Sequence, residues 1–505
     1  MPTKSINWHA IKAASDHGFL AHGDNPKFRS MRIKFEVPLA HNDPQCDEKI
    51  QLHAELVYGY GQSQTKYDLS DGGLAKSLGP LTSPLCPGSS STLAVYLCGG
   101  PGSDNPAFAY EDLTKSLLDM IKTPVLYLDY RGTVSRKANA QLSKYRITNS
   151  SFEGLSSQQV AQRLMLYRQD SIVADFEAVR LCLNNICQRD IKFALLGQSY
   201  GGWIAMTYLS FLPESLARVW ITGGMPPIGK TPEVVYTALF ERVTHMNELH
   251  YNKYPKDKDD VLKIVKLLAN EHGGNGIRLP NGQRLTARGF LTMGRHLGGG
   301  EAGFKKFHAH VDGLATKGKS YEGLNREDIT GFKLTERPLY AVLHESIYCC
   351  CPGVASKWAA QRVGRGPEMV EKFPWLKEKF NFTSGSLGKL YFSGEMIYDF
   401  MLQDAGLTKL AEASSILAEI EDWPELYDIN VLKGNQVPLT ALIYPNDMYV
   451  DSKLSWETVK TIVPSCIAIQ APEKWHHGRV KTNSLEQPET SCVGYSSCMF
   501  LVEMH

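Results

Sequence analysis

The chain has 505 residues, and its 54 Lys and Arg against 53 Asp and Glu give a formal net charge of +1. This balance argues against nucleic acid or an anionic membrane surface as a partner, because both attract strongly basic proteins. Hydrophobic residues make up 43% and charged residues 21% of the chain, as in a globular protein of one large domain or two to three smaller ones.

The amino-terminal and cysteine patterns predict a cytoplasmic protein without a metal or other cofactor. Residues 1–20 are polar and mixed, without the apolar segment of a secretory signal. No run of about 18 apolar residues predicts a membrane span. The eleven cysteines are an odd number, and none of them shows the repeated spacing of a zinc site. We therefore expect mostly reduced thiols, including the consecutive Cys349, Cys350 and Cys351.

The first predicted elements are an antiparallel strand pair that follows an extension without a clear period. Apolar and polar residues alternate over 31–37 and over 50–58, which is the period of half-buried strands. Residues 61–90 are rich in Gly, Ser and Pro and are expected to form a loop. Continuous apolar strands are predicted further along at 93–97, 124–128, 193–196 and 216–221.

Helical periodicity over 157–187 lies between these strands. Apolar strands that alternate with helices predict an α/β fold, with a mostly parallel sheet covered on both faces. The strand ending at Leu196 runs into a Gly-x-Ser-x-Gly turn with Ser199 at its apex, and an apolar helical pattern follows. Such a turn strains the serine backbone and exposes its hydroxyl, so the flanking residues must be tiny, as Gly197 and Gly201 are. Ser199 is the candidate nucleophile.

The alternation is lost after the strand 216–221 and returns near the carboxyl terminus. We predict a first core part over 1–225, a helical cap over 226–425 inserted after the sixth strand, and a second core part over 426–480. That second part contains strands at 437–444 and 466–470 around a helix at 452–462. Residues 481–505 show no helical period and form an irregular tail.

Two groups that could activate Ser199 follow the last two predicted strands. Asp447 comes after the strand 437–444, and His476 after the strand 466–470, which gives the hydrolase order of nucleophile, acid and base. His476 would accept the Ser199 proton, and Asp447 would orient the imidazole. Asp451 competes with Asp447 for this role, and position alone leaves His476 and His477 nearly even.

A second glycine-rich turn, Gly99-Gly100-Pro101-Gly102, follows the strand 93–97. Acyl transfer produces a tetrahedral oxyanion that needs two hydrogen-bond donors. We expect these to be the backbone N–H groups of Tyr200 and Gly100. Together the two turns predict a serine hydrolase.

The sequence resembles the proline iminopeptidases (prolyl aminopeptidases) of the α/β-hydrolase superfamily, especially the larger fungal and bacterial members. The likeness covers roughly residues 31–480. It is carried by Gly99-Gly100-Pro101-Gly102, Leu128-Asp129-Tyr130-Arg131-Gly132-Thr133, Gly197-Gln198-Ser199-Tyr200-Gly201-Gly202, His344-Glu345-Ser346-Ile347-Tyr348-Cys349, Ser393-Gly394-Glu395-Met396-Ile397-Tyr398 and Asn446-Asp447-Met448-Tyr449-Val450-Asp451. It departs at Cys98, where the family usually has His, at Val134, and at Arg479-Val480.

The resemblance implies an α/β-hydrolase fold and hydrolysis of the N-terminal residue, commonly proline, from peptides or small amides. It favours His476 over His477, because the family pattern is His-x-Gly. It also implies that Glu345 and Glu395 hold the α-amino group of the substrate, consistent with the need of a buried ammonium for carboxylate partners. The alternative is that both are structural acids paired with arginines of the cap.

Two other functions stay open at this point. The first is a serine esterase or amidase of a secondary-metabolite pathway on the same fold, which would have no ammonium to bind. The second is a non-catalytic binding or scaffold protein that has kept the fold. The sequence does not determine the preferred N-terminal residue or the oligomeric state.

Overall fold

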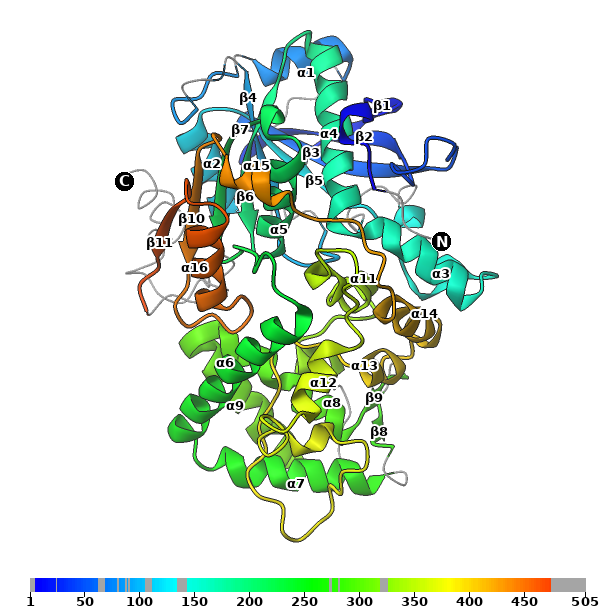
Figure 1. The fold of residues 1–505 in the computed structure, drawn as a ribbon, viewed down its shortest axis with the longest axis vertical. Coiled ribbons are helices and arrows are strands. Elements are labelled where there is room, and N and C mark those ends of the chain that lie inside the picture. Colours follow the sequence, from blue (N-terminus) through cyan, green and yellow to red (C-terminus); the bar gives the residue numbers. More distant parts are fainter. Residues whose placement is uncertain are drawn as a thin grey trace.

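The computed structural model describes residues 5–23, 25–61, 69–79, 81–86, 89, 91–104, 111–133, 143–271, 275–279, 282–317 and 326–473. Within these residues the main sheet has nine strands in the order β1-β2-β3-β5-β4-β6-β7-β10-β11 (Figure 1). The strands are β1 (Asp16–His22), β2 (Phe28–Pro38), β3 (Lys49–Tyr60), β4 (Thr92–Leu97), β5 (Val125–Leu128), β6 (Lys192–Gln198), β7 (Leu216–Thr222), β10 (Leu439–Ile443) and β11 (Ile467–Gln470).

Strand direction divides the sheet into two parts. Pairing is antiparallel from β1 through β2 and β3 to β5. From β5 the strands β4, β6, β7, β10 and β11 are all parallel. Every residue of β4, β5 and β10 is buried, so both faces of the central sheet are covered. The predicted mostly parallel sheet is therefore confirmed, and the fold is that of an α/β-hydrolase.

Helices from several parts of the chain pack on this sheet. They are α2 (Glu111–Ile121), α4 (Gln169–Cys187), α5 (Tyr200–Phe211) and α16 (Ser452–Thr461). The long helix α4 is buried along most of its length, while α2 buries one face, including Leu113, Leu117 and Ile121. Apolar side chains of these helices and of the strands form one continuous core.

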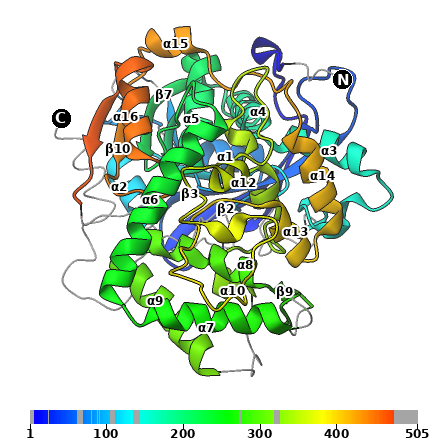
Figure 2. The same ribbon diagram turned by 60° about the horizontal axis from the view of Figure 1, so that its bottom comes forward.

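The chain between β7 and β10 is mainly helical. Its helices are α6 (Pro232–Lys253), α7 (Asp257–Asn270), α8 (Ala287–Leu291), α9 (Gly300–Lys317), α10 (Arg326–Thr330), α11 (Pro338–Leu343), α12 (Ala359–Arg365), α13 (Asp399–Asp404), α14 (Thr408–Ala418) and α15 (Ile429–Lys433). Figure 1 shows α6, α7, α8, α9 and α12 gathered below the sheet, and Figure 2 brings this side forward. A short hairpin of β8 (Ile277–Arg278) and β9 (Arg284–Leu285) interrupts the helices.

Three features differ from the sequence predictions. Strand β1 lies in the supposed extension, so the strand before the helical segment is the seventh, not the sixth. Helix α1 (Asp71–Leu78) lies in the predicted loop, and it begins where the Ser70 side chain accepts a hydrogen bond from the Gly73 N–H. The helix predicted over 157–187 is divided into α3 (Ser157–Leu164), a 3₁₀ turn (Met165–Tyr167) and α4, because Arg168 is extended.

None of the described helices has both the length and the apolar character needed to cross a membrane.

Candidate active site

Ser199 lies at the sharp turn between β6 and α5. Its φ of +55° is in the left-handed region, which non-glycine residues rarely adopt. The turn is so tight that a Cβ on Gly197 would lie 2.5 Å from the Gly201 oxygen, and a Cβ on Gly201 would lie 2.0 Å from the Leu97 oxygen. Both positions therefore require glycine. Ser199 itself is only half buried although its neighbours are buried, so the turn presents its side chain to solvent.

The start of α5 contains the Tyr200 N–H, one of the two predicted oxyanion donors. Tyr200 is the first residue of α5, and its N–H belongs to the first turn, whose N–H groups have no acceptor within the helix. The positive end of the helix dipole is therefore beside Ser199, where a developing negative charge is stabilised.

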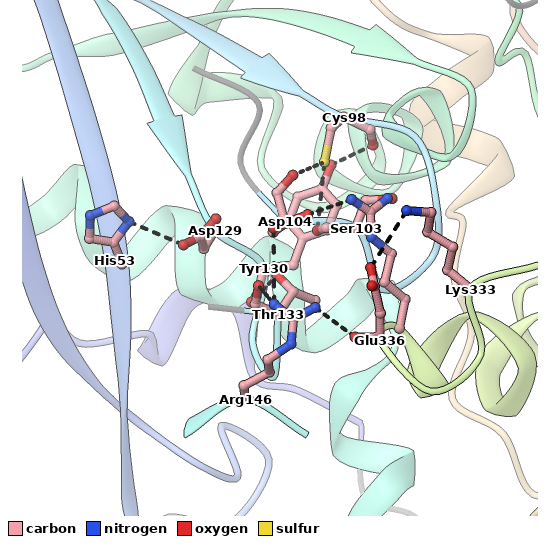
Figure 3. Close-up of polar contacts among 11 residues, drawn as sticks. His53, Cys98, Ser103, Asp104, Asp129, Tyr130, Thr133, Arg146, Lys333 and Glu336 are labelled. Carbon is pink, nitrogen blue, oxygen red and sulfur yellow. Dashed lines mark hydrogen bonds and ion pairs between the residues drawn. The ribbon is translucent and has the colours of Figure 1, made fainter. Parts of the chain in front are cut away.

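The loop after β4 comes directly alongside Ser199. A Cβ on Gly99 would lie 3.1 Å from the Ser199 Cβ, and Gly100 is the next residue. The start of this loop is held by Tyr130, whose hydroxyl donates a hydrogen bond to the Cys98 carbonyl oxygen at 2.8 Å (Figure 3). The Cys98 thiol in turn points to the carbonyl oxygens of Ser103 and Asp104, at 3.8 Å each. The structure thus places the loop with the second predicted donor beside Ser199.

Asp447 follows β10, which pairs with β7, the neighbour of β6. The carboxyl ends of these parallel strands meet at one edge of the sheet, so Ser199 and Asp447 lie at the same edge. Asp447 is buried, and its Oδ1 accepts hydrogen bonds from the N–H groups of Tyr449 and Val450 at 2.8 and 3.1 Å. These bonds fix the carboxylate in one orientation.

Asp451, the competing acid, has a different role. Its Oδ1 caps α16 by accepting from the Leu454 N–H at 3.0 Å, and its Oδ2 accepts from the Arg242 Nε at 2.8 Å. Both carboxylate oxygens therefore have structural partners. The predicted base His476, its rival His477 and the tail 481–505 lie outside the described residues. Strand β11, which precedes them, ends beside β10 with Gln470 paired to Ile443.

Glu345 lies at the amino end of α12. Its carboxylate oxygens accept hydrogen bonds from the backbone N–H groups of Ala359 and Ala360 at 3.1 and 3.0 Å. The side chain is almost fully buried, and burial raises the pKa of this carboxyl group to about 7, although the hydrogen bonds act in the opposite direction. Burial thus favours the protonated form of the Glu345 carboxyl group.

Glu395 pairs with an arginine, as the structural alternative for this residue predicts. Its Oε1 lies 3.2 Å from the Arg295 Nη2 and also accepts a hydrogen bond from the Tyr340 hydroxyl. The Arg295 guanidinium lies over the rings of Phe332 and Tyr340, at 5.3 and 5.2 Å from their centroids. An approaching ammonium would therefore share Glu395 with Arg295.

Tyr348 is a residue of the site that motif analysis did not single out, although it stands in the same segment as Glu345. Its ring packs edge-on against Trp203 of α5 at 6.4 Å and Tyr236 of α6 at 5.6 Å. Burial, and then the negative charges of Glu395, Glu345 and Asp447, raise the pKa of its hydroxyl. Tyr348 thus lies where all three carboxylates act on it, and the only sequence signal for it was its place in the segment that contains Glu345.

Among the described residues, no group of three or more His, Cys, Asp and Glu side chains could hold a metal ion.

Comparison with known proteins assigns the family. The chain is 34% identical over 431 residues to a proline iminopeptidase of Aeromonas sobria, which covers 84% of this chain and 87% of that protein. It is 28% identical to the proline iminopeptidase aneH of Aspergillus aculeatus, over 92% of this chain and 93% of that protein. No protein-family model matches the chain.

Solved structures give a weaker likeness. A thermophilic esterase from Thermogutta terrifontis aligns with 93% of this chain and 99% of its own, with 11% identity and a TM-score of 0.37. The peroxisomal α/β-hydrolase Lpx1 of Saccharomyces cerevisiae covers 95% and 97%, with 9% identity and a TM-score of 0.34. TM-scores this low support no conclusion beyond what the sheet topology already shows. The sequence identity to the Aeromonas enzyme, in contrast, extends over most of both chains. The chain belongs to the proline iminopeptidase family.

Proposed function

We propose that the protein is a serine aminopeptidase that releases the N-terminal residue, proline above all, from peptides or small amides. The observation that carries this proposal is the strained Ser199 turn with the glycine loop Gly99–Gly102 beside it, in a member of the proline iminopeptidase family. The cytoplasmic location predicted from the sequence is supported by nine free thiols among the described residues.

The proposed mechanism has two steps through an acyl-enzyme. His476 removes the Ser199 proton as the oxygen attacks the scissile carbonyl, and Asp447 orients and stabilises the imidazolium. The N–H groups of Tyr200 and Gly100 stabilise the tetrahedral oxyanion. His476 then gives its proton to the leaving amine, and a water molecule hydrolyses the Ser199 ester by the reverse sequence.

The cap is proposed to provide the substrate selectivity. On this proposal the core parts 1–225 and 426–480 carry the reacting groups, and the cap 226–425 contributes Glu345 and Glu395 to the α-ammonium. A charged substrate group in a buried site needs such carboxylates, because an unpaired ammonium is costly to bury.

The test compares hydrolysis of proline 4-nitroanilide with that of its N-acetylated form. We expect cleavage of the free amine only, labelling of Ser199 by a fluorophosphonate, and a loss of at least about 10³-fold in kcat for Ser199→Ala. Equal rates on the two anilides would contradict the aminopeptidase function.

One observation favours the esterase or amidase alternative. Both proposed amine-binding acids already have partners, since Glu345 caps α12 and Glu395 pairs with Arg295. The double variant Glu345→Gln, Glu395→Gln separates the two functions. An aminopeptidase loses activity on proline 4-nitroanilide but keeps its rate on 4-nitrophenyl acetate, whereas an esterase shows the same change on both.

A further inference from the structure

The loop that carries the expected oxyanion donor rests directly on helix α11. Gly102 has a φ of +70°, and a Cβ at this position would lie 2.8 Å from the Tyr340 nitrogen and 2.9 Å from the Leu339 Cβ. The loop backbone therefore touches the first turn of α11 with no room for a side chain between them. A shift of α11 must move the loop as well.

One carboxylate of the same loop joins two arginines. The Asp104 Oδ1 lies 2.8 Å from the Nη2 of Arg337, which is the residue immediately before α11. The Asp104 Oδ2 lies 4.0 Å from the Arg146 Nη1. Arg146 also donates to the Glu336 carbonyl at 2.6 Å and to the Thr133 carbonyl at 3.5 Å. Figure 3 shows Asp104, Arg146, Thr133 and Glu336 converging at this point.

Helix α11 also leads to the proposed amine-binding acids. Tyr340 lies in α11, and its hydroxyl donates to Glu395. Glu345 lies two residues beyond the last residue of α11, Leu343. A single short helix therefore connects the oxyanion loop at its first turn with both carboxylates that would receive the substrate ammonium.

This arrangement answers a geometric requirement of aminopeptidase chemistry. The α-nitrogen and the scissile carbonyl carbon of the substrate are bonded to the same Cα, so their separation is fixed. The oxyanion donors and the amine-binding carboxylates must be held at a matching separation, because a misplacement of about 1 Å can cost about 10²-fold in rate.

We propose that Asp104 is a positioning residue, which sets the distance between the oxyanion loop and the amine-binding acids through its ion pairs with Arg337 and Arg146. This inference rests on the proposed aminopeptidase function. Asp104 does not touch the reacting atoms. Its contribution is to fix the position of Gly100 relative to α11, so that a substrate bound by its amine has its carbonyl group beside Ser199.

The experiment measures kcat and KM of Asp104→Asn, Arg337→Gln and the double variant on two substrates. For proline 4-nitroanilide we expect kcat to fall by about 10- to 100-fold in each variant, with the double variant no worse than either single one. For 4-nitrophenyl acetate, which has no amine to be placed, we expect less than about a threefold change. Asp104→Glu should restore most of the anilide activity, because it keeps the ion pairs.

The control is Glu48→Gln, which removes a partly exposed ion pair with Arg163 far along the chain from this loop. It should leave both rates unchanged. Asp104 and Arg337 are 21% and 41% exposed, so their variants should fold, and a melting curve checks this. Equal losses on both substrates, additive losses or no loss would overturn the inference. The wild-type rate on the anilide tests the proposed function, and an inactive wild type would refute it. The variants test the role of Asp104 separately, because their losses are measured against an active wild type.

Discussion

Glu345 is a buried carboxyl group on which burial and hydrogen bonding act in opposite directions. Burial dominates and raises its pKa to about 7 from an ordinary value of 4.5, which corresponds to about 3 kcal/mol. In the folded protein the group therefore holds its proton at pH values where the unfolded chain has released it. Its contribution to stability is complete below pH 4.5 and is lost as the pH rises through about 7.

We therefore expect Glu345→Gln, which cannot ionise, to remove part of the pH dependence of stability. The melting temperature of the wild type, measured relative to that of the variant, should fall as the pH is raised from 4.5 to about 7.5. Thermal unfolding at several pH values in that interval gives this difference. A difference that stays constant or rises with pH would show that the carboxyl group is ionised well below neutral pH.

At the level of single residues, the sequence was sufficient to predict the conformation of residues that depend only on the neighbouring chain. Ser199 was predicted because a strand, two glycines and a helix leave a serine little choice of conformation, and the structure has that strained turn. For Glu395 one alternative predicted an arginine partner but could not say which one, since Arg295 approaches it only through the folding of the helical segment. His476 lies outside the described residues, so its role stays a prediction.

At the level of elements, hydrophobic pattern predicted the central strands well because they are buried on both faces. It failed at the edge and at short elements. In β1 the polar ends and a register shift between Phe19 and Ala21 weaken the alternation, and β1 forms only against β2. In α1 two glycines suggest a loop, but the Ser70 cap and the burial of Leu74 and Leu78 favour a helix.

The turn at Ser199 makes a prediction at this level, through Gly201→Ala. The added methyl group would lie 2.0 Å from the Leu97 oxygen, so β4 and α5 would have to separate. We expect a loss of about 1–3 kcal/mol in stability and a clear fall in kcat, because α5 begins at the proposed nucleophile Ser199 and β4 leads into the proposed oxyanion loop. Thermal unfolding and anilide hydrolysis measure the two effects.

The matched control is Gly313→Ala on α9, where an added Cβ meets no atom within 4 Å. Because alanine favours a helix, this change should stabilise the protein by up to about 1 kcal/mol and leave kcat unchanged. If both variants behaved alike, the steric account of the turn would be wrong.

At the level of the whole molecule, Arg168 connects the sheet layer to distant parts of the helical segment. Its guanidinium is fully buried, pairs with Asp170 at 2.9 Å and lies 4.6 Å from the Trp423 ring. It also donates to the carbonyl oxygens of Cys349 and Pro424 at 2.9 and 2.8 Å. The helix is thus interrupted between α3 and α4 where the Arg168 side chain is buried. No local sequence pattern could have predicted this interruption, because the partners of Arg168 in residues 349 and 423–424 are distant in the chain.

Replacement of Arg168 by Met should therefore lower the free energy of unfolding of the whole protein. The variant removes the cation that is paired with the buried Asp170 and the donor to the Cys349 and Pro424 carbonyl groups, and breaking a buried ion pair typically costs about 3–5 kcal/mol. We expect a markedly lower melting temperature, measured by circular dichroism. Arg163→Met, which removes a partly exposed ion pair in the neighbouring helix, should change stability by about 0–1 kcal/mol. Equal effects of the two substitutions would contradict a special role for Arg168.

The position of β10 between β7 and β11 has a consequence for the order of events during biosynthesis. The proposed nucleophile is translated more than two hundred residues before the proposed acid, and the pairing of β10 with β7 places that acid at the edge of the sheet where Ser199 lies. A nascent chain on the ribosome therefore carries Ser199 before the proposed acid Asp447 has been made. On the proposed mechanism, full hydrolytic activity therefore requires that synthesis has passed both β10 and β11.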